Sequence, residues 1–281
     1  MKLSIITINR NNVIGLEKTM RSVADQTYKE FEYIVVDGAS TDGSVDVIKK
    51  IEPKFTHLKW VSEPDKGIYN AMNKGLRMAT GDYIQILNSA DCLVDSGVIE
   101  RMLVNLEKKG YPSMLYGNMV KCFPDGRKMV DKCFAGQEIT MLGMYYGSLN
   151  HDPTYICRDL FEKYGYYDES LRIVSDWKWF LQAIIIGGEK PQYVDETVTL
   201  FDMTGISETN KELDKTERKQ VLEQLFPEAV LRDYEQYAFP ISQMKRLQRH
   251  TWAYKVFWTL ERCLFKLEKS RKEKNKVLMY E

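Results

Sequence analysis

The chain has 281 residues, of which 44% are hydrophobic and 28% are charged, the usual balance of a globular protein with a full core. A formal net charge of +0 excludes the overall basic excess expected of a nucleic-acid-binding protein. This length predicts one large α/β domain, or a domain of roughly 200 residues with an appendage.

The cysteines and the apolar segments suggest a location. Five scattered cysteines without paired or metal-binding spacing fit a reducing cytoplasm. The first apolar stretch is too short for a signal peptide, and no run approaches the roughly 18 apolar residues of a membrane-spanning helix. We therefore expect a cytoplasmic protein.

Apolar strands and amphipathic helices alternate over the first part of the chain. Continuous apolar runs predict strands at 3–8, 31–36, 58–61 and 83–87. Helical spacing predicts helices at 13–24, 45–51, 68–78 and 98–108, the last of them capped by Asp95 and Ser96. The short links between these segments predict an α/β fold with a Rossmann-like, doubly wound and mostly parallel sheet.

The pattern changes after residue 114. Turn residues and clustered aromatics between 114 and 150 predict mixed sheet and loop. Helical spacing returns at 158–164 and 176–186, and a strand is expected at 192–201. Beyond about residue 208 the pattern is helical, which predicts a C-terminal helical extension.

Polar side chains follow four of the predicted strands. Thr7 and Asn9 lie at the end of the first strand, and Asp37, Asp65 and Asp91 follow the next three. The carboxyl ends of parallel strands meet at one edge of such a sheet, where ligands bind. The Rossmann glycine fingerprint and the phosphate-binding P-loop are both absent from the sequence, which excludes the two commonest nucleotide-binding loops.

Five segments together carry a family resemblance. They are S-I-I-T-I-N-R from Ser4, V-V-D-G-A-S-T-D-G-S from Val35, S-E-P-D-K-G-I-Y-N-A-M-N-K-G from Ser62, G-D-Y-I-Q-I-L-N-S-A-D from Gly81 and S-D-W-K-W-F from Ser175. In this order and spacing the chain resembles the family 2 glycosyltransferases, inverting enzymes of the GT-A fold, of the type that builds bacterial polysaccharides. The resemblance implies a catalytic domain over residues 1–207, with a donor half at 1–91 and an acceptor and catalytic half at 92–207, followed by a helical extension at 208–281.

The resemblance implies a nucleotide-diphosphate-sugar donor, most simply a UDP-sugar. Asp37 would accept a hydrogen bond from the N3–H of uracil, and Lys66 would lie toward the ribose and diphosphate. For Lys66, a solvated helix face is the competing interpretation. The donor-binding side chains implied in this way are Thr7, Asn9, Asp37, Asp65, Lys66, Asn73, Asn88 and Asp91.

The family usually carries a D-x-D or D-x-D-D loop whose carboxylates hold Mg²⁺ or Mn²⁺ against the donor diphosphate. Here residues 88–91 are N-S-A-D, so Asn88 and Ala90 replace two acids and Asp91 alone remains. Asp91 is therefore the expected ligand of Mn²⁺ or Mg²⁺, and Asn88 would hydrogen-bond a sugar hydroxyl or the ribose. Two alternatives stay open: a solvent-facing Asp91, and a metal-independent transferase in which basic groups stabilise the diphosphate.

Inverting transfer needs one general base to take the proton of the attacking hydroxyl. The resemblance assigns this role to Asp176, at the start of a helix whose dipole would keep it ionised. His151 would contact the departing diphosphate or the acceptor hydroxyl, with a structural histidine as the competing interpretation. Of the two tryptophans on this helix, Trp177 and Trp179, one would stack on a sugar face, and Trp177 is assigned to the acceptor side.

Residues 245–276 predict a basic amphipathic helix, because they hold eleven Lys and Arg against three Glu, a net charge of +8. Apolar residues recur at helical spacing from Ala253 to Leu267. The other side carries Lys255, Arg262, Lys266 and Lys269. One interpretation is contact with anionic lipid on the inner face of the cytoplasmic membrane, near a lipid-linked acceptor. The other is a helix packed on the catalytic domain or on the second subunit of a homodimer.

These features predict an inverting glycosyltransferase with a saccharide or lipid-linked saccharide acceptor, working in surface polysaccharide or glycan assembly, without a nucleic-acid partner. A nucleotidyltransferase on a similar sheet should show a glycine- and arginine-rich loop after the first strand, which residues 9–12 do not match. A non-catalytic sugar-nucleotide-binding protein would explain the depleted acidic loop, but it would not explain why Asp91 and Asp176 are present.

Overall fold

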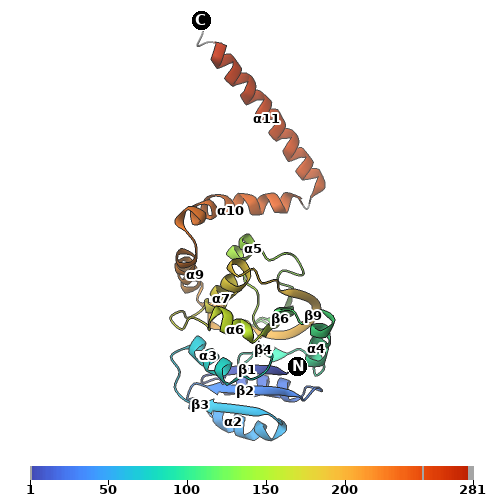
Figure 1. Ribbon diagram of the computed structural model, residues 1–281, viewed down its shortest axis with the longest axis vertical. Coiled ribbons are helices and arrows are strands. Elements are labelled where there is room, and N and C mark those ends of the chain that lie inside the picture. The colour runs from blue at the N-terminus through green and yellow to red at the C-terminus, as the bar shows by residue number, and fades with distance from the viewer. Residues whose placement is uncertain (1, 249, 278–281) are drawn as a thin grey trace. The chain divides into compact units, whose positions relative to one another are not determined.

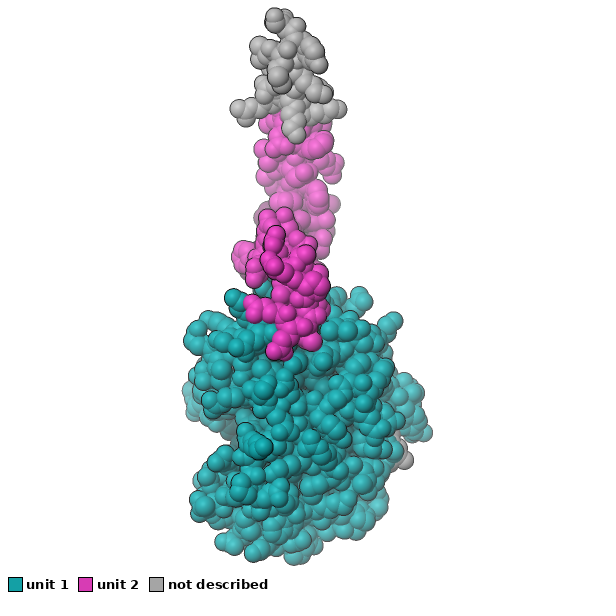
Figure 2. Space-filling view, turned by 60° about the vertical axis from the view of Figure 1, so that its left-hand side comes forward, with its two compact units in different colours: residues 1–221 teal, residues 222–281 magenta. Residues whose placement is uncertain are grey.

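The computed structural model of the protein describes residues 2–248 and 250–277, with the side chains of residues 207 and 269–277 outside that description. The chain divides into two compact units, Met1–Val221 and Leu222–Glu281, which Figure 2 distinguishes by colour. The first unit holds the sheet and every candidate site residue, so the two units are described separately.

Four parallel strands form the N-terminal half of the sheet (Figure 1). They are β1 (Leu3–Asn9), β2 (Phe31–Asp37), β3 (Leu58–Ser62) and β4 (Tyr83–Ile86), in the order β3-β2-β1-β4. The connecting helices are α1 (Val13–Ala24), α2 (Ser44–Ile51), α3 (Ile68–Met78) and, after β4, α4 (Val98–Lys108). A short 3₁₀ helix, Glu52–Lys54, follows α2.

The two faces of β1 bury different helices because its side chains alternate. Ile5 belongs to one buried cluster with Leu16 of α1 and Ile48 of α2. Ile6 faces α3, where a Cβ added to Gly75 would lie 2.4 Å from the Ile6 side chain. Helices therefore cover both faces of the parallel strands, as the continuous apolar runs predicted.

The second half of the sheet is mixed. β8 (Thr154–Cys157) runs antiparallel to β4, and β6 (Met114–Cys122) is antiparallel to β8. β9 (Gln192–Asp202) pairs parallel with β6, while β5 (Cys92–Leu93) and β7 (Lys128–Asp131) add antiparallel edges. The helices of this half are α5 (Met141–Tyr146), α6 (Asp159–Tyr164), α7 (Ser175–Phe180) and α8 (Ile206–Thr209). The α/β fold is confirmed, with antiparallel strands added to its parallel half.

Two local predictions were wrong. Helix α4 begins after Gly97 without a side-chain cap, because Asp95 instead accepts from the Gly97 amide and binds Arg101. The helix expected over 176–186 is α-helical only as α7, and Leu181–Ile186 forms a π-helix.

Three helices make up most of the described chain after residue 208. Helix α9 (Lys211–Leu225) packs into the first unit through Val221, which is fully buried. The helix predicted over 245–276 is divided between α10 (Glu228–Gln248) and α11 (Thr251–Val277), and the side chain of Lys269 lies outside the described residues. Across residues 2–248 and 250–277, no helix combines the length and apolar character that crossing a membrane requires.

Candidate active site

An open cavity of about 950 Å³ lies at the carboxyl ends of the parallel strands. The end of β1, the segments that follow β3 and β4, the start of α3 and the segment that leads into α7 all contribute to its wall. This is the edge where doubly wound sheets bind ligands. The predicted site residues that line it are Asn9, Asp65, Lys66, Asn88, Asp91, His151 and Asp176.

Thr7 and Asn73 do not line this cavity, which corrects two of the expected donor contacts. Thr7 is fully buried, where its hydroxyl donates to the Leu87 carbonyl and accepts from Tyr33. Asn73 is also buried. Its side-chain amide donates to the Tyr167 carbonyl and accepts from the Tyr167 backbone N–H. Both side chains connect elements of the fold, and neither presents a polar group to a ligand.

Asp37 is also corrected. Its carboxylate is fully buried and accepts four hydrogen bonds, two from Ser40, one from Asn9 and one from Ser62, at 2.6–2.9 Å. Burial opposes ionisation, but the hydrogen bonds from Ser40, Ser62 and Asn9 hold the pKa of Asp37 below its usual value. A carboxylate offers about four acceptor positions. All four are used here, so Asp37 organises the base of the cavity and has no acceptor position left for a uracil N3–H.

Trp177 lies beside the site, and both its indole N–H and its ring face already have partners within the protein. It is almost fully buried, its indole N–H donates to the Met144 carbonyl at 2.8 Å, and the Arg218 guanidinium lies 4.4 Å from the ring centre. Because Arg218 covers the ring, Trp177 offers no open face on which a sugar could stack. Trp179 packs among aromatic residues of the core, including Phe161.

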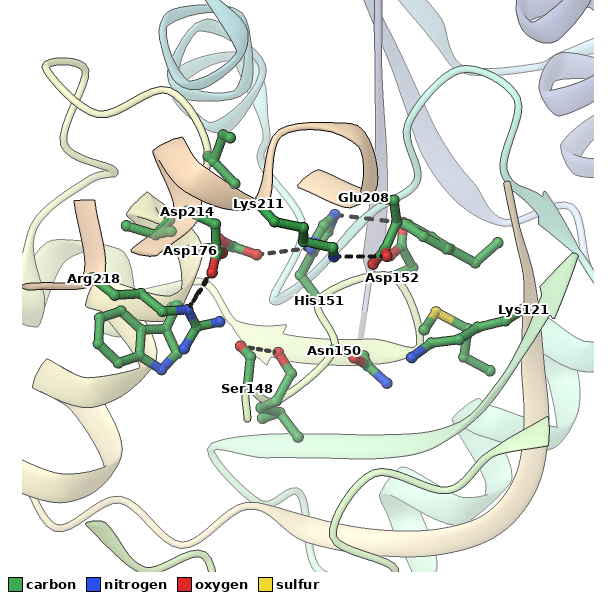
Figure 3. A pocket seen from close by; sticks show the side chains of 16 residues that line it. Lys121, Ser148, Asn150, His151, Asp152, Asp176, Glu208, Lys211, Asp214 and Arg218 are labelled. Atoms are coloured by element: carbon green, nitrogen blue, oxygen red, sulfur yellow. Dashed lines mark hydrogen bonds and ion pairs between the residues drawn. The ribbon is translucent and has the colours of Figure 1, made fainter. Parts of the chain in front are cut away.

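Asp176 reaches the cavity from the first turn of α7 and is held from two sides. Tyr69 donates to Asp176 Oδ1 at 3.0 Å. His151 Nδ1 lies 3.0 Å from Asp176 Oδ2 (Figure 3). Burial opposes ionisation, but the hydrogen bonds and the charge of His151 keep the pKa of Asp176 below its usual value. The side chain is therefore an ionised and partly exposed base at neutral pH.

His151 connects Asp176 to the loop after β4. Its Nε2 lies 3.1 Å from Asn88 Nδ2 and 3.5 Å from Asp152 Oδ1. Burial lowers the pKa of His151, but the carboxylates of Asp152 and Asp176 outweigh it and raise the pKa to about 9. A protonated ring donates from both nitrogens, which favours the flipped Asn88 amide, whose Oδ1 would then accept from Nε2. As placed, Asn88 Oδ1 is buried without a partner.

Asp91 is less exposed than expected. It is buried beside Asp152, and its Oδ1 accepts from the Asp202 backbone N–H at 2.8 Å. Burial and the neighbouring Asp152 carboxylate raise the pKa of Asp91 well above its usual value. Two adjacent buried carboxyl groups favour either a shared proton or a bound cation.

The acidic side chains beside this loop fit a hard divalent cation. Asp91 and Asp152 supply buried carboxylate oxygens, a ligand type that Mg²⁺ and Mn²⁺ prefer. Among the described residues, no three His, Cys, Asp or Glu side chains form a complete metal site. The protein would thus provide part of a coordination shell, with phosphate oxygens and water as the remainder.

Ala90 stands in the loop where the family usually carries acids. Its φ is 86°, in the left-handed region that is uncommon for a residue with a Cβ. The Ala90 amide donates to Thr19 Oγ1 at 3.0 Å, and its carbonyl accepts from Lys18. Position 90 is therefore a turn position held by α1.

A second cavity, of about 210 Å³, meets the first at His151 and Asp176 (Figure 3). Its far wall is formed by one face of α9, with Lys211, Asp214 and Arg218. Near its centre, Asn150 Nδ2 is buried without a hydrogen-bond partner. The Asp176 carboxylate therefore stands between two spaces, a large one at the sheet edge and a smaller polar one under α9.

Several residues of the site were missed in the sequence. Tyr69 was passed over as a helix residue, although it stands in the K-G-I-Y-N-A-M-N motif that drew attention to its neighbours. Asp152 adjoins His151 but was not among the expected site residues. The α9 residues carried no signal, because only the folded chain brings that helix to Asp176.

Comparison with known proteins identifies the family. The sequence profile described as "Glycosyl transferase family 2" matches residues 4–161. An uncharacterized glycosyltransferase of Mycobacterium tuberculosis is 32% identical over 212 residues, covering 73% of this chain and 76% of its own. A PGL/p-HBAD biosynthesis glycosyltransferase of Mycobacterium bovis is 24% identical over 73% of this chain and 79% of its own.

Solved structures show the same fold. Residues 1–349 of S. aureus TarS in complex with UDP-GlcNAc superpose with a TM-score of 0.63 at 19% identity, over 82% of this chain and 69% of that 1–349 chain. A mannosyltransferase from Pyrobaculum calidifontis in complex with GDP-Man and Mn²⁺ gives a TM-score of 0.60 at 15% identity, over 79% and 63% of the two chains. The chain is a glycosyltransferase and belongs to glycosyl transferase family 2.

Proposed function

We propose that this glycosyltransferase inverts the anomeric centre of a UDP-linked sugar as it transfers that sugar to a saccharide hydroxyl. The observation that carries the proposal is the position of Asp176, an ionised carboxylate at the junction of two cavities. The larger cavity has the room and the position for a nucleotide sugar. The smaller cavity, lined by polar side chains, suits a hydroxylated acceptor.

Support for UDP comes from the TarS complexes with UDP and UDP-GlcNAc. The uracil contact once expected from Asp37 is not part of the proposal, because that carboxylate has no free acceptor position. Arg10, Asp65 and Lys66 line the part of the cavity beside β1 and β3, and an ion pair of 3.7 Å joins Arg10 to Asp65. In this proposal, Arg10 and Lys66 provide positive charge along the donor.

In the proposed reaction, Asp176 accepts the proton of the acceptor hydroxyl as that oxygen bonds to the anomeric carbon. The bond between the anomeric carbon and the diphosphate breaks, and the nucleoside diphosphate leaves on the opposite face. Tyr69 and His151 fix the two carboxylate oxygens, so the base is oriented before substrate arrives.

A divalent cation held by Asp91, with Asn88 beside it, would stabilise the negative charge on the departing diphosphate. Support comes from the buried carboxylates of Asp91 and Asp152 and from the Mn²⁺ in the Pyrobaculum calidifontis complex. Mg²⁺ would serve in the same way.

The lipid-linked form of the acceptor is proposed from α11. Trp252, Val256, Leu260, Leu264 and Leu267 share one helix face, and each is at least half exposed. Lys255, Arg262 and Lys266 lie on the opposite side of the helix. A basic amphipathic helix with an open apolar face suits an anionic lipid surface, where a lipid-linked saccharide in polysaccharide assembly would be found.

The test of this function is UDP release from a UDP-sugar with and without a saccharide acceptor mixture. We expect acceptor-dependent release with Mn²⁺ or Mg²⁺, and its loss in EDTA. Asp176→Asn should lower the acceptor-dependent rate by about 10²-fold or more, while UDP still raises the melting temperature as it does in the wild type. Equal release by Asp176→Asn and the wild type would contradict the role of the base, and equal release in EDTA would contradict the role of the cation.

A further inference from the structure

Glu217 is a buried acid on α9, outside the segment that matches the family profile. Its side chain accepts hydrogen bonds from three consecutive backbone amides, those of Arg172 at 2.7 Å, Ile173 at 2.9 Å and Val174 at 3.2 Å. Only 5% of the residue is exposed. A buried carboxylate is costly unless it accepts hydrogen bonds, and backbone amides just before a helix are costly unless they find an acceptor. The contact with Glu217 therefore holds the backbone of residues 172–174 in place.

The segment that Glu217 holds leads directly to the proposed base. Val174 precedes Ser175, the first residue of α7, and Asp176 is the second. The single hydroxyl proton of Tyr69 is shared between two acceptors, the Ile173 carbonyl and Asp176 Oδ1. A shift of the backbone at 172–174 would therefore move Asp176 and its hydrogen-bond donor together.

The next residue of α9 holds the other flank. Arg218 lies over the ring of Trp177 and donates to the Gly147 carbonyl at 3.2 Å. It also pairs with Asp214 (Figure 3). Glu217 and Arg218, consecutive residues of α9, thus contact the chain just before and just after Asp176. Helix α9 also lines the smaller cavity, so its position is tied to the space proposed for the acceptor.

We infer that Glu217 is a positioning residue for the transfer reaction, acting through the backbone of 172–174 to orient the Asp176 carboxylate. This inference rests on the proposed function, because it needs Asp176 to be the base. The chemistry is supplied by Asp176, and Glu217 contacts neither donor nor acceptor. Errors of about 1 Å in the placement of a reacting group cost up to about 10²-fold in rate.

The experiment compares Glu217→Gln with wild type in the full-length protein. The amide keeps the shape but presents one NH₂ group to backbone N–H donors, so the segment should shift. We expect kcat to fall about 10- to 100-fold, while the KM for the UDP-sugar and the melting shift produced by UDP stay within about 3-fold of wild type. Glu212→Gln is the matched control, because Glu212 lies on the same helix with 87% of its side chain exposed, and it should keep wild-type kcat.

A double variant separates positioning from general loss of structure. If Glu217 acts through Asp176, then Asp176→Asn with Glu217→Gln should be as slow as Asp176→Asn alone. The inference is overturned if Glu217→Gln lowers the residual rate of Asp176→Asn by the same factor as in wild type, or if Glu217→Gln keeps wild-type kcat.

A shorter acid covers the case in which Glu217→Gln does not fold. Glu217→Asp keeps the charge but loses one methylene, so it should satisfy fewer of the three amides and give an intermediate kcat. Wild-type kcat in Glu217→Asp would also overturn the inference. If Asp176→Asn transfers sugar at the wild-type rate, the proposed function is contradicted. If Asp176→Asn is slow but Glu217→Gln keeps the wild-type rate, only the inference about Glu217 is contradicted.

Discussion

Ala90 has a φ of 86°, an uncommon conformation for a residue with a Cβ, in the loop proposed to face the donor diphosphate. Such strain costs about 1–2 kcal/mol and persists only where the surroundings enforce it. Here Thr19 and Lys18 of α1 bind the amide and carbonyl of Ala90. The loop conformation is thus imposed by α1 and opposed by the side chain at position 90.

Ala90→Gly should relieve this strain. Glycine adopts a positive φ without steric cost, although it adds flexibility to the unfolded chain, so a net gain of about 1 kcal/mol is expected. For a domain of this size that gain corresponds to about 2–4 °C in Tm, measured by thermal melting. Ala79→Gly is the control. Ala79 has a φ of −71°, so the same substitution there should destabilise the protein. A lower Tm for Ala90→Gly would contradict the strain argument.

The sequence predicted where site residues fall along the chain better than where their side chains point. Asn9 and Thr7 are two residues apart and share a face of β1, yet only Asn9 lines the cavity. Thr7 is buried, and its hydroxyl donates to the Leu87 carbonyl at the end of β4. Asp37 follows its strand as expected, but Ser40 and Ser62 take up its oxygens. Such pairings depend on neighbours distant in sequence, which no local pattern contains.

At the scale of elements, local patterns predicted the helices of the parallel half well. The bounds of α1, α3 and α4 match the apolar spacing residue for residue, because each helix buries one continuous stripe. The insertion of β8 between β4 and β6 was not predictable in this way. Its antiparallel partners come from separate parts of the chain, and strand pairing over such distances leaves no periodic signal.

Glu32 of β2 ties neighbouring elements together and should make stability depend on pH. Its buried carboxylate accepts from Ser4 of β1, Lys59 of β3 and Thr80 after α3. Burial opposes ionisation, yet the hydrogen bonds from Lys59, Ser4 and Thr80 prevail and lower the pKa from 4.5 to about 2. Because the folded pKa is the lower one, the contribution is complete above about pH 5 and is lost as the pH falls toward 2.

Glu32→Gln should therefore lower the free energy of unfolding at neutral pH and change it little at low pH. The lowered pKa of Glu32 corresponds to a loss of about 3 kcal/mol as an upper value. The measurement is the difference in unfolding free energy between wild type and variant, from urea titrations at pH 7 and at pH 2.5. Glu107→Gln, on the exposed face of α4, should follow the wild-type pH dependence. A Glu32→Gln variant whose deficit is the same at both pH values would refute the role of ionisation.

Helix α11 should bind anionic lipid through its apolar face. Leu260→Glu with Leu264→Glu removes two exposed apolar side chains, each worth about 1.5–3 kcal/mol when buried, so affinity for phosphatidylglycerol vesicles should fall at least about 10-fold in sedimentation assays. Lys255→Gln should weaken binding to these vesicles about 5-fold and leave phosphatidylcholine unaffected.

Val130→Glu on β7 is the control for that experiment, because Val130 is a similarly exposed apolar residue of the first unit. It should leave vesicle binding at the wild-type value. If the paired leucine substitutions instead abolish self-association measured by light scattering, and vesicle binding is unchanged, the face belongs to a homodimer.

At the scale of the whole molecule, the boundary of the catalytic unit decides which part of the chain is needed for transfer. The family resemblance implied a boundary at residue 207. The compact first unit extends to Val221, because most of α9 is built into it. Glu217, Arg218 and Val221 all lie between the two boundaries, and all make buried contacts there.

Two truncations test this boundary. A chain of residues 1–225 keeps all of α9 and should fold, melt close to the full-length protein and retain the melting shift produced by UDP. A chain of residues 1–207 leaves three backbone amides at 172–174 without their acceptor and uncovers the pocket that Val221 fills. At about 1 kcal/mol or more for each amide and about 2 kcal/mol for the valine, the loss is about 5 kcal/mol. That corresponds to about 10 °C or more in Tm for a domain of this size. Equal melting of the two truncations would show that α9 is an appendage, and the positioning role of Glu217 would fall with it.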